Sequence, residues 1–154
     1  MKTKFRSLAS LLVLSAVGAL VVAGCGGGGG SSSAGGGDFV SGAEAACTGA
    51  NRQIAALGTP QQAQVTGYLE KTEAVIEKLH QEVAALDGSG AAETAYTEGL
   101  AEAIPVLTAM TNAARSENFD AVRELSSGLV EIHLGELAEA AKLKTCAEVP
   151  VSES

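Results

Sequence analysis

Three cysteines carry the most reactive side chains of this sequence, and their settings differ. Cys25 follows Val22-Ala23-Gly24 at the end of an apolar segment, whereas Cys47 and Cys146 lie in the long Ala- and Leu-rich part that follows. A cysteine thiolate can act as a nucleophile, bind a metal or enter a disulfide. The sequence around each cysteine therefore indicates which of these reactions is open to it.

Cys25 ends a segment with the features of an export signal. Residues 1–7 carry three basic side chains, and residues 8–23 are uncharged and mostly apolar. A basic start, an apolar stretch and small residues occur in this order in secretory signals. A transmembrane helix is the alternative, but about 16 apolar residues are fewer than the roughly 20 that span a bilayer. The order of residues therefore favours a signal over a span.

The motif Val22-Ala23-Gly24-Cys25 resembles the lipobox of bacterial lipoproteins. The resemblance covers residues 1–25 and implies cleavage between Gly24 and Cys25, with attachment of acylated glycerol to the Cys25 sulfur. It also implies a protein held by membrane lipid on the extracytoplasmic face of the cell membrane. Two or more acyl chains give stable anchoring, whereas one gives marginal binding. We therefore expect residues 1–24 to be removed and Cys25 to be the lipidated first residue.

Residues 25–38 are expected to be the lipidated cysteine and a disordered tether. Residues 26–37 contain only Gly, Ser and Ala, a composition typical of flexible linkers. No G-x-x-x-x-G-K-[ST] pattern is present, so a phosphate-binding loop is not expected. Removal of the signal takes away three basic side chains, which changes the net charge from −8 to −11. That acidity argues against nucleic acid as a partner.

Residues 39–149 are expected to form one all-α domain, an antiparallel up-down four-helix bundle, followed by a tail at 150–154. Apolar residues recur every three or four positions, which places them on one face of a helix. Aromatic residues make up only 3% of the chain, so Ala, Leu and Val must form the core, and this favours helices over a sheet. The expected helices span about 39–57, 60–86, 91–116 and 119–143.

Capping and helix-breaking residues set the expected helix boundaries. Thr59 is expected to cap the second helix, with Pro60 at its first position and Gln62 completing a capping box. Asn118 is a favourable N-cap for the fourth helix. Pro105 should bend the third helix or divide it in two, because proline removes a hydrogen bond inside a helix.

Cys47 and Cys146 remain after Cys25 is lipidated, and an even number of cysteines in an exported chain predicts a disulfide. An unbroken fourth helix would place Cys146 about 40 Å from its start, whereas Cys47 lies about 15 Å from the end of the first helix. Either the fourth helix ends early and residues 143–146 fold back, or the first helix is offset. Two buried free thiols are the alternative, and two cysteines alone do not make a zinc site.

The pattern Cys47-x-x-x-Asn51, with four Ala-rich helices and a final cysteine, is similar to small exported helical proteins of high-GC Gram-positive bacteria. The similarity covers about residues 47–146. It implies the helical fold and the disulfide, but no particular activity.

Glu77 and His80 form a Glu-x-x-His pattern, the unit that di-iron carboxylate bundles use to bind metal. Ile76 and Leu79 take the core face of the same helix, so both candidate ligands should point outward. A metal site is therefore not expected, and no cofactor is predicted. His133 should be partly buried and hydrogen-bonded. Thr72 should bond back to its own helix, with a ligand contact as the alternative.

No recognisable catalytic motif is present. The sequence lacks Gly-x-Ser-x-Gly, and neither histidine has a Ser or Asp partner at a defined spacing. We expect a non-enzymatic interaction or accessory module at the membrane, with an envelope protein as its partner. A bundle that binds a small ligand or a metal in its interior is the alternative. An apolar cavity between helices would favour the ligand, and a wide exposed apolar patch would favour the protein partner.

Overall fold

The computed structural model describes residues 36–148, and all regular structure in this range is helical. The prediction of an all-α domain is confirmed for this range. The expected signal, the lipidated Cys25, most of the tether and the tail at 150–154 lie outside the described residues. None of the helices between residues 36 and 148 is both long and apolar enough to cross a membrane.

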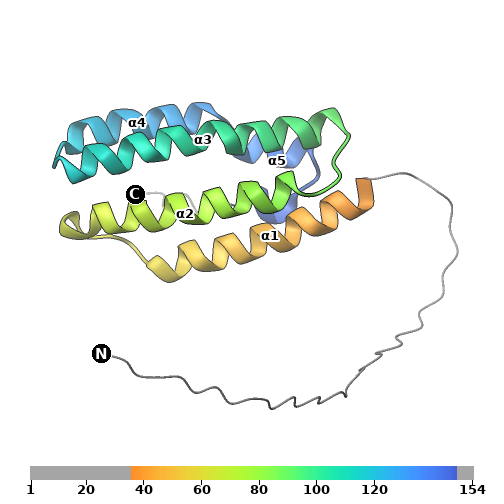
Figure 1. The fold of residues 1–154 in the computed structure, drawn as a ribbon, viewed down its shortest axis with the longest axis horizontal. Coiled ribbons are helices and arrows are strands. Elements are labelled where there is room, and N and C mark those ends of the chain that lie inside the picture. The colour runs from red at the N-terminus through yellow and green to blue at the C-terminus, as the bar shows by residue number, and fades with distance from the viewer. Residues whose placement is uncertain (1–35, 149–154) are drawn as a thin grey trace, which may run out of the picture. The chain divides into compact units, whose positions relative to one another are not determined.

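Six α-helices and one 3-10 helix make up the described part of the fold, of which α5 and α6 are the shortest α-helices (Figure 1). The long helices are α1 (Gly36–Leu57), α2 (Val65–Ala84) and α3 (Ala91–Arg115). A short 3-10 helix, η1 (Gln62–Gln64), precedes α2. The chain then forms α4 (Phe119–Glu131), α5 (Leu134–Ala140) and α6 (Lys144–Ala147).

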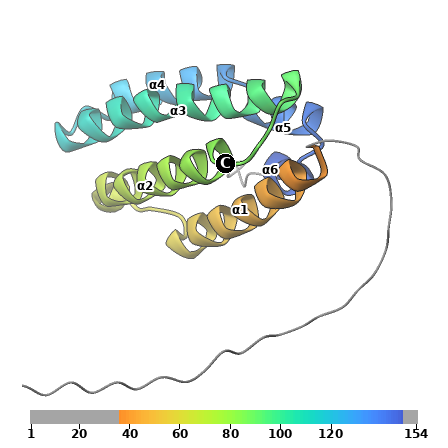
Figure 2. The same ribbon diagram turned by 45° about the vertical axis from the view of Figure 1, so that its right-hand side comes forward.

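Helices α1 to α4 pack in chain order, each on the next, and the two short helices close one end of this row. Helix α5 packs on α3, and α6 packs on both α5 and α1. Figure 2 shows α3 with α4 on one side, α1 with α2 on the other, and α5 and α6 between them at one end. Helix α1 has no extensive contact with α4 in the described part of the chain, so the row does not close into a ring there.

The expectation of a single fourth helix is wrong, because the chain breaks twice between Phe119 and Ala147. His133, after α4, has a φ of 54°, and Lys142, after α5, has a φ of 62°. At the second break the Leu143 N–H donates to the Ala138 carbonyl at 2.8 Å. Both residues adopt the left-handed conformation that ends many helices and that glycine usually supplies. Neither break has a glycine at the left-handed position, so a glycine in the sequence does not indicate where the helix ends.

The expected start of the second helix is also wrong. Thr59 and Pro60 precede the helical residues, and α2 begins at Val65. One bond of the capping-box type forms instead at η1, where the Gln61 N–H donates to the Gln64 side-chain oxygen at 3.1 Å. The Gln61 side chain makes no capping bond there, and the Gln64 N–H donates to the Gln61 main-chain carbonyl at 2.7 Å.

The other two boundary predictions have opposite outcomes. Helix α3 runs without a break through Pro105, whose exposed ring lies on its outer face, so the predicted division is wrong. The predicted cap is confirmed, because the Asn118 side-chain oxygen accepts a hydrogen bond from the Ala121 N–H at 3.2 Å.

Two clusters of buried apolar side chains hold the helices together. The larger includes Phe39, Val83 and Leu143 and joins α1, α2, α3, α5 and α6. The smaller, around Leu69 and Met110, joins α2, α3 and α4. The two clusters lie at different levels along α2 and α3, which leaves a stretch of these helices between them.

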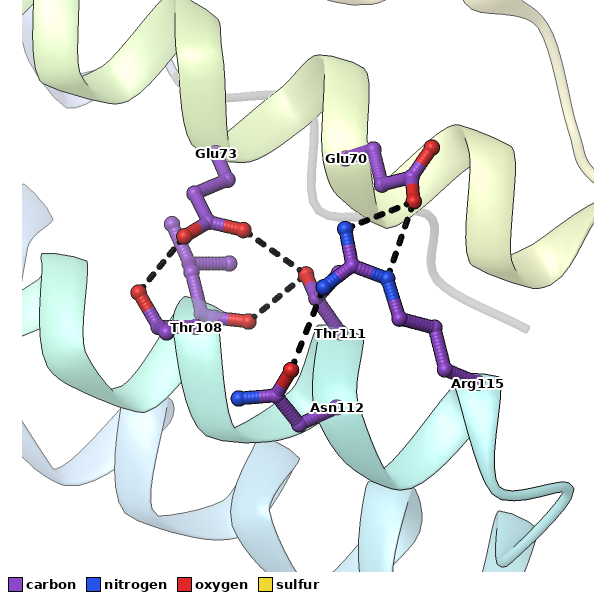
Figure 3. A network of polar contacts seen from close by, with 7 residues as sticks. Glu70, Glu73, Thr108, Thr111, Asn112 and Arg115 are labelled. Carbon is purple, nitrogen blue, oxygen red and sulfur yellow. Dashed lines mark hydrogen bonds and ion pairs between the residues drawn. The ribbon is translucent and has the colours of Figure 1, made fainter.

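A polar network fixes α2 against α3 beside the smaller cluster (Figure 3). The Glu73 carboxylate accepts hydrogen bonds from the hydroxyls of Thr108, at 2.6 Å, and Thr111, at 2.9 Å. Thr111 is the buried polar residue of the described domain, with 1% of its surface exposed. Near the end of α3, Arg115 pairs with Glu70 at 2.8 Å. These contacts fix the position of α2 along α3, and both helices contribute to the wall of the cavity.

Gly99 on α3 lets α5 approach closely. A Cβ atom at this position would lie 2.7 Å from Leu137 Cδ1 and 3.1 Å from Leu134 Cδ2. The absence of a side chain therefore allows α5 to cover α3 next to the same cavity.

Candidate functional site

A cavity of about 330 Å³ lies between the helices, and all six α-helices contribute to its lining. Small-molecule sites measure about 300–1,000 Å³, so this cavity has the size of a small ligand. The three long helices α1, α2 and α3 contribute equally and supply most of the lining residues. Large aliphatic side chains of α2 and α3, including Ile76, Leu79, Leu100 and Leu107, form part of this wall.

The cavity follows from short side chains and from the gap between α1 and α4. Ala50 on α1 and Ala103 on α3 line it with single methyl groups. Because α4 packs on α3 and has no extensive contact with α1, no long helix covers this side. Leu129 and Val130 of α4 line the cavity there, and Val130 is 69% exposed, which places it at the opening.

Cys47 and Cys146 line the cavity where α1 meets α6. Their sulfur atoms lie 2.03 Å apart and their Cα atoms 5.2 Å apart, the spacing of a disulfide. Both residues are buried. Of the two ways to bring these cysteines together, the structure shows the first, because α4 ends early and the following residues fold back.

Thr145, next to Cys146, is held by two side chains of α1. The Asn51 amide donates to the Thr145 carbonyl at 2.8 Å, and the Glu44 carboxylate accepts from the Thr145 N–H at 3.0 Å. Hydrogen bonds from Thr145 lower the pKa of Glu44 below its ordinary value, despite the opposing effect of burial. Residues 44, 47 and 51 thus form one face of α1 that fixes α6. The sequence pattern around Cys47 includes Asn51 but does not indicate the contact of Glu44 with Thr145.

Tyr96 places a buried hydroxyl in the cavity wall. The residue is 2% exposed, and its hydroxyl lies 3.3 Å from the Cys47 sulfur. A disulfide sulfur has no proton, so Tyr96 is the donor, and sulfur is a weak acceptor. Burial raises the pKa of Tyr96 above its ordinary value, and the negative charge of Glu44 adds to the increase. Tyr96 therefore stays a neutral hydroxyl at physiological pH.

The described lining contains no Asp, Glu, Lys or Arg side chain. His133 lies at the edge, with 58% of its side chain exposed and its Nδ1 atom 3.3 Å from a Glu136 carboxylate oxygen. The expectation that His133 is partly buried is therefore wrong, because the break after α4 turns it toward solvent. The interior of the cavity is uncharged.

No protein-family model, curated protein or solved structure matches the chain. The cavity and its lining residues are therefore the basis for interpreting the site.

The weak metal candidates lie elsewhere on α2. Glu77 is exposed, His80 is half-buried, and neither lines the cavity. Across residues 36–148, no three His, Cys, Asp or Glu side chains gather closely enough to hold a metal ion. The structure does not bring Glu77 and His80 together with further ligands.

Thr72 makes the expected bond back to its own helix, and its predicted ligand contact stays a prediction. Its hydroxyl donates to the Tyr68 carbonyl at 3.0 Å, as expected for a threonine inside a helix. Thr72 also lines the cavity. Because its proton is used within the helix, Thr72 contributes its methyl group and an acceptor oxygen to the wall.

The site as a whole suits binding. Its wall is apolar and uncharged, and its most buried polar group is a hydroxyl next to a disulfide. Small-molecule sites commonly combine such an apolar wall with a few placed polar groups that orient the ligand.

Proposed function

We propose that this protein is a lipid-anchored domain on the extracytoplasmic face of the cell membrane, where it binds a small, mostly apolar molecule. The apolar cavity of about 330 Å³ is the observation that supports ligand binding. The motif Val22-Ala23-Gly24-Cys25 supports the anchor. The proposal includes a non-enzymatic role and an antiparallel up-down order of α1 to α4, which their short connections favour.

The distribution of apolar surface favours a ligand over a protein partner. Among the described residues, Val130 is the large apolar side chain that is exposed, and it lies at the cavity opening. A protein-binding surface would be expected to carry a wider apolar patch. Binding of an envelope protein stays a prediction from the sequence.

The cavity can be tested by filling it. Ala103→Leu places a larger side chain in the cavity, and Ala101→Leu places the same side chain on the exposed face of the same helix. We expect a neutral fluorescent probe of eleven non-hydrogen atoms, 1-naphthylamine, to bind the wild-type protein. Ala103→Leu should weaken that binding at least tenfold, and Ala101→Leu should leave it unchanged.

Circular dichroism of both variants would show that each retains its helices. A wild-type protein that does not bind the probe, or a folded Ala103→Leu variant that binds it equally well, would contradict the proposed function.

The anchor can be tested by mass spectrometry of the protein purified from its host. The proposal expects a chain that begins at Cys25 and carries added acyl mass. A chain that still begins at Met1, or that carries no such mass, would disprove the anchor without bearing on the cavity.

A further inference from the structure

We infer that the molecule bound in the cavity is uncharged and carries a carbonyl or hydroxyl oxygen that hydrogen-bonds to Tyr96. The inference rests on the proposed function and names the chemical class of ligand for the same site. Three features of the cavity carry it: its lack of charge, the bonding of Tyr96, and its volume.

The lining disfavours a charged group in the interior of the cavity, away from His133 at its edge. No Asp, Glu, Lys or Arg side chain is present among the described lining residues to pair with a buried charge. An ion transferred into an apolar site without a partner loses its hydration with no compensation. The carboxylate of Glu44 also acts on Tyr96, so an anionic group beside this tyrosine would be repelled. Carboxylates and phosphates are therefore disfavoured at the Tyr96 end.

Tyr96 is the polar group best placed to orient a ligand. Its hydroxyl is buried, and the hydrogen bond found for it goes to the Cys47 sulfur at 3.3 Å. Most buried hydroxyls have a stronger oxygen or nitrogen partner. A ligand oxygen in the cavity would give the Tyr96 proton a better acceptor than sulfur, and a ligand hydroxyl could also donate to the phenol oxygen.

The rest of the wall fits an apolar body of limited size. Beyond Tyr96, the cavity is bounded mainly by aliphatic side chains, including Leu100 and Leu107 of α3 and Leu129 of α4. At about 30 Å³ for each water-sized unit, 330 Å³ corresponds to about eleven such units. The expected ligand is a neutral alcohol, ketone or ester with about ten to twelve non-hydrogen atoms in the cavity.

Three probes of nearly the same shape separate these features. 4-Phenyl-2-butanone is neutral and carries a carbonyl group, 3-phenylpropanoate carries a charge, and isopentylbenzene has no polar group. Each can be measured by displacement of 1-naphthylamine from the full mature chain at pH 7. We expect the ketone to bind at least tenfold more tightly than the carboxylate.

The Tyr96→Phe variant tests the hydrogen bond. We expect it to weaken ketone binding about three- to tenfold, the usual effect of one neutral hydrogen bond, and to leave isopentylbenzene within twofold. Thr97→Val is the control, because it removes a hydroxyl of the same helix that bonds to the Glu93 carbonyl at 3.0 Å and does not line the cavity, and it should leave both affinities unchanged.

The outcomes distinguish the inference from the proposed function. If the wild-type protein binds neither the fluorescent probe nor any of the three compounds, the proposed function fails. If it binds the carboxylate as tightly as the ketone, or if a folded Tyr96→Phe variant binds the ketone with unchanged affinity, the inference about the ligand is overturned. The proposed function, binding of a small molecule in the cavity, is then retained. The ketone and carboxylate comparison needs only wild-type protein, so it decides the charge requirement even if Tyr96→Phe does not fold.

Discussion

Loss of the Cys47–Cys146 disulfide should lower the stability of the domain substantially, because this bond joins residues 99 positions apart. Cross-linking a loop of about 100 residues removes enough unfolded-chain entropy to stabilise the native state by about 4.7 kcal/mol at 25 °C. For a domain of this size, 1 kcal/mol shifts the melting temperature by about 4 °C. The double variant Cys47→Ala/Cys146→Ala should therefore melt about 15–20 °C below its parent.

The native contacts around the disulfide should largely survive its removal. Thr145 keeps its hydrogen bonds to Asn51 and Glu44, so α6 retains polar contacts with α1. The expected loss thus comes mainly from a more disordered unfolded state. Far-ultraviolet circular dichroism at 20 °C should show nearly the same helix content for the variant and its parent.

Thermal denaturation in a Cys25→Ser background measures the effect without interference from a third thiol. A reducing agent should lower the melting temperature of the parent toward that of the double variant and should leave the double variant unchanged. A double variant that melts within about 5 °C of its parent would refute the entropic argument. Two reactive thiols in the unreduced, denatured parent would refute the disulfide itself.

Three further substitutions test individual features of the fold. Glu44 has a lowered pKa, so its stabilising effect is complete above its ordinary pKa of 4.5 and is lost as the pH falls through the lower folded value. Glu44→Gln should therefore cost stability in urea unfolding at pH 7, and a difference from wild type that stays constant down to pH 2 would contradict this. Pro105→Ala should stabilise α3 by about 1–3 kcal/mol, because it supplies a missing helix hydrogen bond at an exposed position; a lower midpoint in urea would show that the proline is needed. Lys142→Gly should raise stability by about 0.5–1 kcal/mol, because glycine adopts the φ of 62° without strain, and a loss measured in the same assay would argue against strain there.

Much of the helical structure could be predicted from the spacing of apolar residues. The spacing of Leu100, Ala103 and Leu107 predicts that they share one face of the third helix, and all three are buried. The fourth helix was harder to predict, because His133 and Lys142 adopt the left-handed conformation that glycine usually supplies. The sequence left open that the fourth helix ends early, but neither residue type marks a position of positive φ, so the places of the breaks were not predicted.

The cavity could not be recognised from the same pattern. Apolar side chains that line a cavity recur every three or four residues along a helix, and so do those that fill a core. Ile76 and Leu107 have this spacing on their helices, and both line the cavity. The difference depends on what lies opposite them. Here the opposite side carries the methyl group of Ala50 and the space that α4 leaves beside α1, and both depend on how distant helices pack.

The break after α4 links the disulfide to the cavity. A continuous helix from Phe119 to Ala147 would extend about 43 Å, longer than the roughly 37 Å of the 25-residue helix α3 on which it packs. Such a helix would carry Cys146 past the end of α3, far from its partner on α1. Because the chain turns at His133, α5 and α6 return across the end of the bundle and bring Cys146 to Cys47. The same turn shortens α4, and the space between α4 and α1 becomes the opening through which we expect the ligand to enter.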